Sequence, residues 1–155
     1  MAAILTLENL NYGYIDGGYK REILKNLSYS FEEGTFYTIL GPSGSGKTTL
    51  LSIMAGLDKQ ESGKVFYGNE DVDKMGLYQY RRNKVGVVFQ SYNLITYLTG
   101  LENVLLAMTE TDNKLPKNHT ELAYALLNMV GIVNTKANRL VTRLSGGEQQ
   151  RIAIA

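Results

Sequence analysis

Apolar and polar residues alternate along the beginning of the chain with the period that is typical of β-strands. The alternation covers residues 3–14 and returns over residues 27–32, so each stretch predicts a half-buried strand. Between them, residues 15–21 contain Asp16-Gly17-Gly18, a sequence that favours a turn. The beginning of the chain therefore predicts strands separated by a turn.

A glycine-rich stretch then separates two segments of different period. Residues 35–40, TFYTIL, combine β-branched, aromatic and aliphatic residues, which predicts a strand buried on both faces. Residues 47–56 instead space their apolar residues as a helix does. A strand, a glycine loop and a helix in this order predict the beginning of an α/β fold.

Shorter elements follow this helix. Residues 63–68, GKVFYG, predict a strand between glycines, and residues 77–83 predict a short basic helix. Residues 85–89, VGVVF, are uncharged and predict a second buried strand. This mixture of strands and helices continues the α/β pattern.

The pattern becomes helical in the second half of the chain. Residues 102–108 and 121–130 predict amphipathic helices, and a polar loop containing Pro116 connects them. Residues 149–155 predict the first turns of a further helix. Because 155 residues suit a single domain, we interpret residues 100–143 as a helical insertion within that domain.

The composition excludes several classes of protein. The formal net charge of +1 argues against broad electrostatic binding to nucleic acid or to acidic membranes. The absence of cysteine excludes disulfides, thiolate zinc sites and cysteine nucleophiles. No apolar run approaches the roughly 20 residues of a membrane span, and the N-terminus lacks the pattern of a secretory signal. We therefore expect a cytoplasmic chain that does not itself insert into a membrane.

One motif points to a specific chemistry. Residues 41–48, GPSGSGKT, match G-x-x-x-x-G-K-[ST], the phosphate-binding P-loop. Its glycines allow backbone N–H groups to turn inward around phosphates, and the helix that begins near Lys47 adds a favourable dipole. Lys47 supplies an ammonium for the β- and γ-phosphates, and the hydroxyl of Thr48 is suited to bind Mg²⁺. The motif therefore predicts a phosphate-binding site.

Two further residues carry weaker local signals. Gln90 ends the predicted strand 85–89, where its neutral amide oxygen could join a metal shell and position water, although such a glutamine is usually just solvated. Tyr14 ends the first predicted strand, where its ring could stack on a purine base. Most of the eleven tyrosines must simply pack against the protein or line its surface, so the local sequence leaves this choice open too.

The last motif, residues 144–148 (LSGGE), opens the final predicted helix and has two interpretations. In the first, Ser145 and Glu148 form a capping box, because the glutamate lies three residues after the serine. In the second, the serine and the two glycines expose backbone N–H groups that hold a phosphate at the helix N-terminus. Local physics favours the two equally.

Taken together, these motifs resemble those of the ATP-binding domains of ABC transporters. Residues 41–49 are similar to the Walker A motif, Gln90 stands in the place of the Q-loop glutamine, and residues 144–151, LSGGEQQR, resemble the ABC signature. The order and spacing of the three motifs fit that family, and the resemblance covers essentially the whole chain. It implies an α/β fold of the P-loop NTPase type, with an N-terminal antiparallel β subdomain and a helical insertion.

The resemblance also implies a cofactor, partners and site residues. ATP with Mg²⁺, bound at Lys47 of one subunit, would be covered by the signature of a second copy, and closing of this dimer would move a transmembrane permease docked near residues 90–99. Tyr14 is the aromatic residue that would stack on adenine, with Tyr12 as the alternative. Glu148 stands where glutamine is commoner in the signature, and either residue completes the cap.

The implied site residues fall into three groups. Lys47 and Gln90 are the catalytic candidates, and Thr48 and Gln90 are the candidate ligands of Mg²⁺. The candidate ATP-binding residues are Tyr14, Gly41, Pro42, Ser43, Gly44, Ser45, Gly46, Lys47, Thr48, Thr49, Ser145, Gly146, Gly147 and Glu148.

Finer features resemble one subgroup of the family, the ATPases of lipoprotein release, macrolide export and antimicrobial-peptide export. The similar stretches are residues 55–58 (AGLD), residues 89–94 (FQSYNL) and residues 98–104 (LTGLENV), together with the insert at residues 16–20. This resemblance implies a subunit that acts in export or release and sits on the cytoplasmic face of the cell membrane through its permease.

The resemblance is incomplete at one point. The family follows its signature helix with a hydrophobic strand ending in Asp-Glu, the Walker B motif, whereas this chain stops at Ala155. We therefore expect the N-terminal part of an ABC ATPase, without the glutamate that acts on the attacking water. The first hypothesis is a transport ATPase of which these residues are the front part. The alternatives are a fragment that binds nucleotide without hydrolysing it, or a soluble ABC ATPase of repair or translation, whose usual long insertions or paired cassettes are not seen here.

Overall fold

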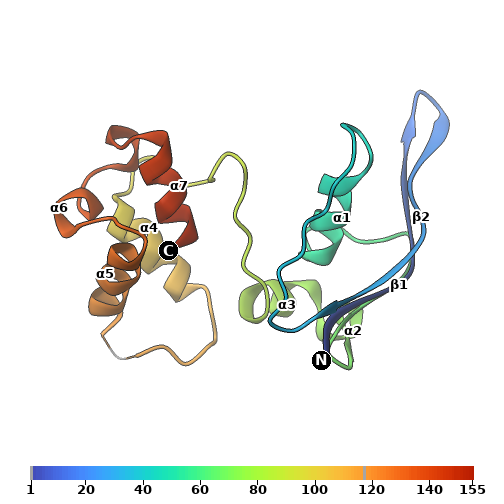
Figure 1. Cartoon of the computed structure of the whole chain (residues 1–155), viewed down its shortest axis with the longest axis horizontal. Coiled ribbons are helices and arrows are strands. Elements are labelled where there is room, and N and C mark those ends of the chain that lie inside the picture. Colours follow the sequence, from blue (N-terminus) through green and yellow to red (C-terminus); the bar gives the residue numbers. More distant parts are fainter. Residues whose placement is uncertain (1, 117) are drawn as a thin grey trace. The chain divides into compact units, whose positions relative to one another are not determined.

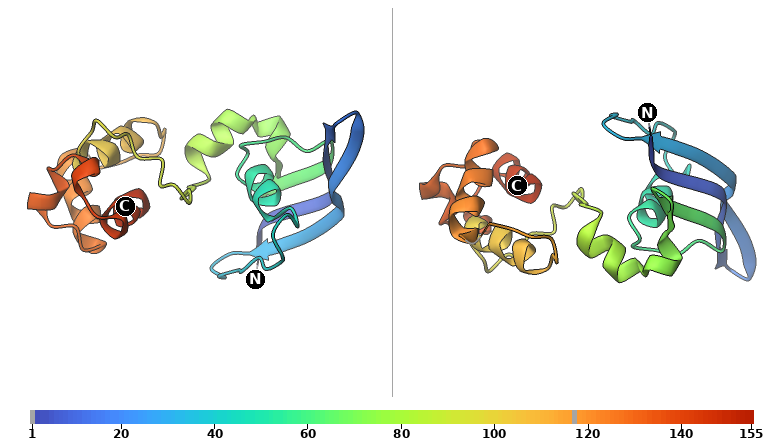
Figure 2. Two further views of the ribbon diagram at one scale, coloured as in Figure 1. Left: turned by 90° about the horizontal axis from the view of Figure 1, so that it is seen from above. Right: turned by 90° about the horizontal axis from the view of Figure 1, so that it is seen from below.

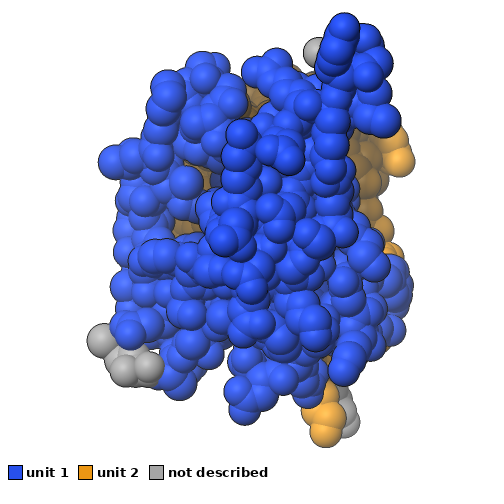
Figure 3. Space-filling model, turned by 90° about the vertical axis from the view of Figure 1, so that its right-hand side faces the viewer, with its two compact units in different colours: residues 1–86 blue, residues 87–155 orange. Residues whose placement is uncertain are grey.

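The computed structural model describes residues 2–116 and 118–155, with the backbone alone at Asp16. The chain divides into two compact units, residues 1–86 and residues 87–155, which Figure 3 shows in different colours. Each unit has a hydrophobic core of its own. The interpretation of one domain with an insertion at residues 100–143 remains a prediction.

The first unit contains an antiparallel sheet. β1 (Ala3–Asp16) and β2 (Tyr19–Glu32) form a long hairpin around the predicted turn (Figure 1). β1 pairs on its other side with β3 (Ser62–Tyr67), which pairs in turn with the short β4 (Glu70–Asp71). The order in the sheet is β2-β1-β3-β4, and every neighbouring pair is antiparallel. This arrangement confirms the α/β class with an N-terminal antiparallel sheet.

Helix α1 (Lys47–Met54) lies against one face of this sheet (Figure 2). Its buried residues are Leu50 and Ile53, which lie three apart and so share one face of the helix. They belong to one core with the buried residues of the strands and the following helices, Leu7, Leu10, Leu24, Val65, Val72 and Tyr80. The loop that leads into α1 is therefore attached to the sheet through the helix that follows it.

Two short helices, α2 (Val72–Met75) and α3 (Leu77–Asn83), complete the first unit. Tyr80 of α3 is buried, and its hydroxyl donates a 2.8 Å hydrogen bond to the carbonyl of Met54 at the end of α1. Burial raises the pKa of Tyr80 to about 12, because the phenolate form would lose its solvation. Arg81 adds a hydrogen bond to the carbonyl of Gly56, so α3 is anchored to the end of α1 twice.

The second unit is helical. It contains α4 (Gly100–Thr109), α5 (His119–Met129), α6 (Asn134–Ala137), a 3-10 turn (Val141–Arg143) and α7 (Gly146–Ile154). Its core is formed by Leu101, Val104, Met108, Ala123, Leu127, Ile132, Ala137, Val141, Leu144 and Ile152. The predicted helices 102–108 and 121–130 are confirmed with small shifts of their ends. Within the described part of the chain, no helix is long and apolar enough to cross a membrane.

Two predicted strands are wrong. Residues 35–40 and 85–89 have no strand structure, and Phe36 and Leu40 are 92% and 84% exposed. A strand requires a hydrogen-bonded neighbour, and none of the four strands in the described residues pairs with either segment. Only Tyr37 and Ile39 of the first segment are half-buried, so it keeps the alternation of a strand without its pairing.

Candidate functional site

The predicted phosphate loop leads directly into α1, and two of its glycines lie close to neighbouring side chains. Gly46 has the left-handed φ of 90°, and a Cβ there would come within 2.8 Å of Cγ2 of Ile23. A Cβ on Gly41 would come within 2.7 Å of the Ser45 hydroxyl oxygen. Glycine is therefore required most strongly at Gly46, where a positive φ and a close approach to β2 coincide, whereas at Gly41 the loop packs against its own Ser45 side chain.

The N-terminus of α1 is left open to an anion. Among the described residues, no side chain caps it, and its first turn contains no acidic residue. By contrast, α4 and α7 each begin with a capping box in which a glutamate approaches the helix N-terminus. The first N–H groups of α1 therefore remain available to an external acceptor, and the helix dipole favours a negative one.

Lys47 is the first residue of α1, and its ammonium turns back over the loop. It donates hydrogen bonds to the carbonyls of Gly41 at 2.9 Å and of Pro42 at 2.8 Å. These two bonds leave one of the three ammonium donors for a further acceptor. Thr48, the next residue, is exposed with its hydroxyl on the first turn of the helix.

This arrangement fits the triphosphate that the resemblance implies. The glycine contacts, the uncapped helix and the folded-back ammonium form a cradle with donors and a positive charge, as phosphate oxygens require. The structure therefore brings the candidates of residues 41–49 together in the first unit.

The two tyrosines proposed for adenine differ in their surroundings. The hydroxyl of Tyr12 donates a 2.6 Å hydrogen bond to Oδ2 of Asp58, and the Tyr12 side chain is half-buried. Tyr14 is 45% exposed and lies opposite Arg21 in the hairpin. The ring of Tyr14 therefore keeps a larger free surface, which favours it over Tyr12 as a stacking residue.

The capping box predicted at the signature is confirmed. Ser145 is the N-cap of α7, and its hydroxyl accepts a 3.4 Å hydrogen bond from the N–H of Glu148. In return, the Glu148 carboxylate accepts a 2.9 Å hydrogen bond from the N–H of Ser145. The second interpretation, phosphate binding by the same segment, remains a prediction because the capping box does not exclude it.

Glu148 has a partner that sequence reasoning missed. Its second carboxylate oxygen accepts a 2.5 Å bond from the ammonium of Lys136 on α6, and the Glu148 side chain is only 13% exposed. This ammonium, together with the N–H of Ser145, lowers the pKa of Glu148 to about 2, so the group is ionised at neutral pH. The one available signal was the acidic residue at this position of the signature, but nothing in the sequence identified its counter-ion.

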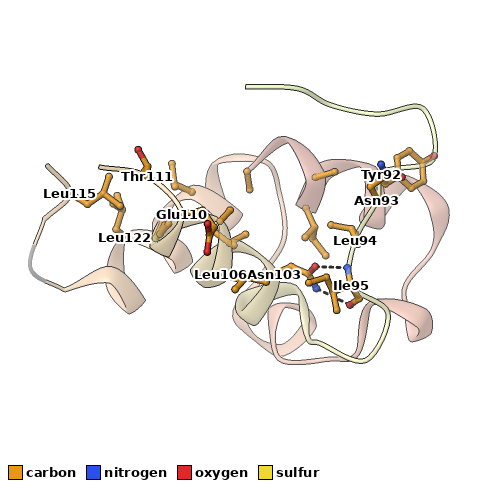
Figure 4. Close-up of a pocket in the computed structure, with 17 residues that line it drawn as sticks. Tyr92, Asn93, Leu94, Ile95, Asn103, Leu106, Glu110, Thr111, Leu115 and Leu122 are labelled. Atoms are coloured by element: carbon orange, nitrogen blue, oxygen red, sulfur yellow. Dashed lines mark hydrogen bonds between the residues drawn. The ribbon is translucent and has the colours of Figure 1, made fainter. Parts of the chain in front are cut away.

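Gln90 does not lie at a strand end as predicted. It lies in an exposed turn that follows the non-strand residues 85–89. Tyr92 and Asn93, two and three residues later, have left-handed φ values of 62° and 51°. The chain beyond this turn is fixed by Asn103 of α4, which accepts a 2.8 Å bond from the N–H of Ile95 and donates one of 3.2 Å to its carbonyl (Figure 4). The role of Gln90 remains a prediction.

An apolar groove of about 520 Å³ lies beside this segment in the second unit (Figure 4). It is bounded by residues 92–95, by α4 and by the end of α7. Its lining includes Leu94, Leu106, Met108, Leu115, Leu122, Leu126 and Ile152. The groove begins within the stretch 90–99 that was expected to meet a partner.

Comparisons with known proteins agree with these motifs. A family model described as "ABC transporter" matches residues 24–155. The chain is 41% identical to YclH of Bacillus subtilis, an uncharacterized ABC transporter ATP-binding protein, over 98% of the chain and 66% of YclH. It is 44% identical to LolD of Aquifex aeolicus, the ATP-binding protein of a lipoprotein-releasing system, over 100% of the chain and 68% of LolD.

Solved structures show the same similarity. The ATP-binding cassette MJ0796 of Methanocaldococcus jannaschii, solved as a dimer bound to ADP and Pi, superimposes with a TM-score of 0.87 at 38% identity, covering 97% of this chain and 67% of MJ0796. CbiO1 of Clostridium perfringens, part of the transporter complex CbiONQ, gives a TM-score of 0.78 at 27% identity, covering 99% of this chain and 60% of CbiO1. The chain thus spans about two thirds of the length of these relatives.

Proposed function

The chain belongs to the ABC transporter family, and on that premise we propose that it is the ATP-binding part of such a transporter, coupling ATP binding and hydrolysis to passage of a substrate through a membrane permease. The observation that carries the proposal is the uncapped N-terminus of α1 beneath a glycine loop that the Lys47 ammonium closes. Export or release is the proposed direction, supported by the similarity to LolD.

The residues of the loop have distinct tasks in this proposal. Backbone N–H groups along residues 41–49 bind the phosphates, and Lys47 neutralises charge on the β- and γ-phosphates. The Thr48 hydroxyl and the Gln90 amide oxygen are the proposed ligands of Mg²⁺, and Tyr14 holds the adenine. The bound MgATP supplies the phosphoryl group, while the chain orients it and stabilises the charge that develops.

A second copy of the chain completes the site in this proposal. Ser145, Gly146 and Gly147 at the start of α7 offer N–H groups to the phosphate held by the other copy. The dimeric structure of the relative MJ0796 with ADP and Pi supports this arrangement.

The permease is the third proposed partner. The apolar groove beside residues 92–95 supports docking there, because burial of a partner's apolar side chains in such a groove is favourable. Membership of CbiO1 in a transporter complex supports the same assignment. The chain would then lie at the cytoplasmic face of the cell membrane, bound through its permease.

Binding of MgATP to residues 1–155 tests the proposal, with calorimetry as the measurement. We expect binding by the parent, and a loss of at least about tenfold in affinity in Lys47→Ala, because the ammonium meets the phosphates directly. Lys74→Ala on α2 removes an exposed lysine outside the loop and is the matched control. Equal affinity in the parent and Lys47→Ala would rule out the assigned loop.

Binding without hydrolysis is a second candidate function for residues 1–155 by themselves. It is favoured by the sequence, which contains no Asp-Glu pair of the Walker B type. Phosphate release from MgATP distinguishes the two. Turnover that Lys47→Ala abolishes would support hydrolysis by these residues, and binding without turnover would support the second candidate.

A further inference from the structure

The start of α7 carries a negative charge at the place where the proposed function requires an anion to bind. Both oxygens of the Glu148 carboxylate are engaged, one by the N–H of Ser145 at 2.9 Å and one by the ammonium of Lys136 at 2.5 Å. An isolated carboxylate this close to the first turn would repel a phosphate, because like charges disfavour each other. A glutamine at the same position would cap the helix without this repulsion.

Lys136 is well placed to remove the repulsion. It extends from α6, whose next residue, Ala137, is fully buried in the core with Leu127 and Ile132. The backbone at Lys136 is therefore held in place by the core. From there the lysine side chain reaches Glu148 directly. A second cation lies nearby, since the Arg151 guanidinium is 3.8 Å from the position that a Cβ on Gly147 would occupy. Of these two cations, Lys136 is the one that forms an ion pair with Glu148.

We propose that Lys136 is a positioning residue for the signature: it holds Glu148 in the cap and cancels its charge, so that the N–H groups of Gly146 and Gly147 can donate hydrogen bonds to an anion. The inference rests on the proposed function, in which these groups meet a phosphate of ATP. Lys136 itself touches neither the nucleotide nor the reacting atoms, and it acts only through Glu148.

Titration with inorganic phosphate, followed by NMR at the amides of Ser145, Gly146 and Gly147, tests this role without requiring dimerisation or hydrolysis. We expect Lys136→Met to weaken phosphate binding at these amides at least fivefold, because Glu148 then keeps an uncompensated charge. The double variant Lys136→Met/Glu148→Gln should return to within twofold of the parent, since glutamine still accepts the bond from the N–H of Ser145. Lys136→Arg should keep the parent affinity, and Lys74→Met is the matched control for loss of a surface lysine.

Rescue by the double variant separates charge compensation from simple packing, because packing lost with Lys136 would not return when Glu148 becomes glutamine. Unchanged binding in Lys136→Met, failure of the rescue, or no response of these amides in the parent would each overturn the proposal. Should Lys136→Met unfold, a folded double variant with the parent's affinity supports the proposal and an unfolded one overturns it. MgATP binding at Lys47 is read from other residues, so failure of the proposed function is recognised separately.

Discussion

The hydroxyl of Tyr12 donates a 2.6 Å hydrogen bond to the carboxylate of Asp58, which lies 46 residues further along the chain. The bond ties β1 to the segment that follows α1, so it joins the sheet to the helix of the phosphate loop. It also raises the pKa of Tyr12, with smaller contributions from burial and from the nearby charges of Asp58 and Glu61. The hydroxyl of Tyr12 therefore serves the fold, and the proposed function assigns the adenine to Tyr14.

This division of roles predicts opposite effects for two substitutions. Tyr14→Ala should lower the affinity for MgATP about fivefold, since it removes a stacking surface worth roughly 1 kcal/mol. Tyr12→Phe should leave that affinity unchanged and lower the free energy of unfolding by about 1 kcal/mol, because only the bond to Asp58 is lost. Calorimetry with MgATP and urea unfolding of both variants provide the measurements. Unchanged affinity in Tyr14→Ala would contradict the assignment of Tyr14.

The close approach at Gly46 predicts a strong effect of a single methyl group. Gly46→Ala should destabilise the first unit by more than the roughly 1 kcal/mol expected for alanine at a left-handed φ, because its Cβ would also collide with Ile23. Gly131→Ala is the matched control, since Gly131 has a φ of 78° with no atom within 4 Å of the added Cβ. Urea unfolding compares the two variants. Equal losses would show that Ile23 moves aside without cost.

The Glu148 ion pair predicts a dependence of stability on pH. The ammonium of Lys136 and the N–H of Ser145 lower the pKa of Glu148 from 4.5 to about 2 in the folded protein. The folded state therefore binds fewer protons than the unfolded state between these two pKa values. The contribution of Glu148 to the free energy of unfolding is fully present above about pH 5 and is lost as the pH drops from 4.5 towards 2. In Glu148→Gln this part of the pH dependence of the free energy of unfolding should disappear.

Urea unfolding of the parent and of Glu148→Gln at several values between pH 5 and pH 3 measures that dependence. Glu102→Gln is the companion variant, because the N–H and hydroxyl of Thr99 lower the pKa of Glu102 in the capping box of α4. Each variant should remove part of the decrease in the free energy of unfolding between pH 5 and pH 3. An identical pH dependence in the parent and Glu148→Gln would contradict the ion pair.

The hydrogen bonds of the Asn103 side chain predict a local effect on the segment that follows Gln90. Its side chain makes hydrogen bonds to the N–H and carbonyl of Ile95 and to the carbonyl of Thr99. Asn103→Leu should leave the N–H of Ile95 without its partner and destabilise the second unit by about 1–3 kcal/mol, while the carbonyl of Ile95 keeps its 3.1 Å hydrogen bond from the N–H of Leu98. Hydrogen exchange at the Ile95 amide should become faster, and Asn128→Leu, which removes an exposed bond to Asn134, is the control. Unchanged exchange at Ile95 would mean that the segment is held by other contacts.

The periodicity of apolar residues predicted the helices and strands that depend only on residues close together in the sequence. The hairpin, α1, α4 and α5 follow from alternation, helical spacing and glycine turns, and the capping box of α7 follows from two residues three apart. The strand predictions at residues 35–40 and 85–89 were wrong because a strand is defined by its neighbour, which composition does not reveal. The same reasoning applies to the site. The loop of residues 41–49 is contiguous, so its sequence alone predicts a phosphate site, whereas the contact between Lys136 and Glu148, 12 residues apart, required the fold.

Residues 35–40 have a consequence for how the chain behaves at high concentration. The segment is uncharged, contains no proline, and is rich in aromatic and β-branched residues, and it leaves Phe36 and Leu40 exposed. Segments of this composition stack into cross-β assemblies when no strand of their own protein covers them. Residues 1–155 in isolation should therefore form species that bind thioflavin T as their concentration rises, and a charged residue in place of Phe36 should suppress them.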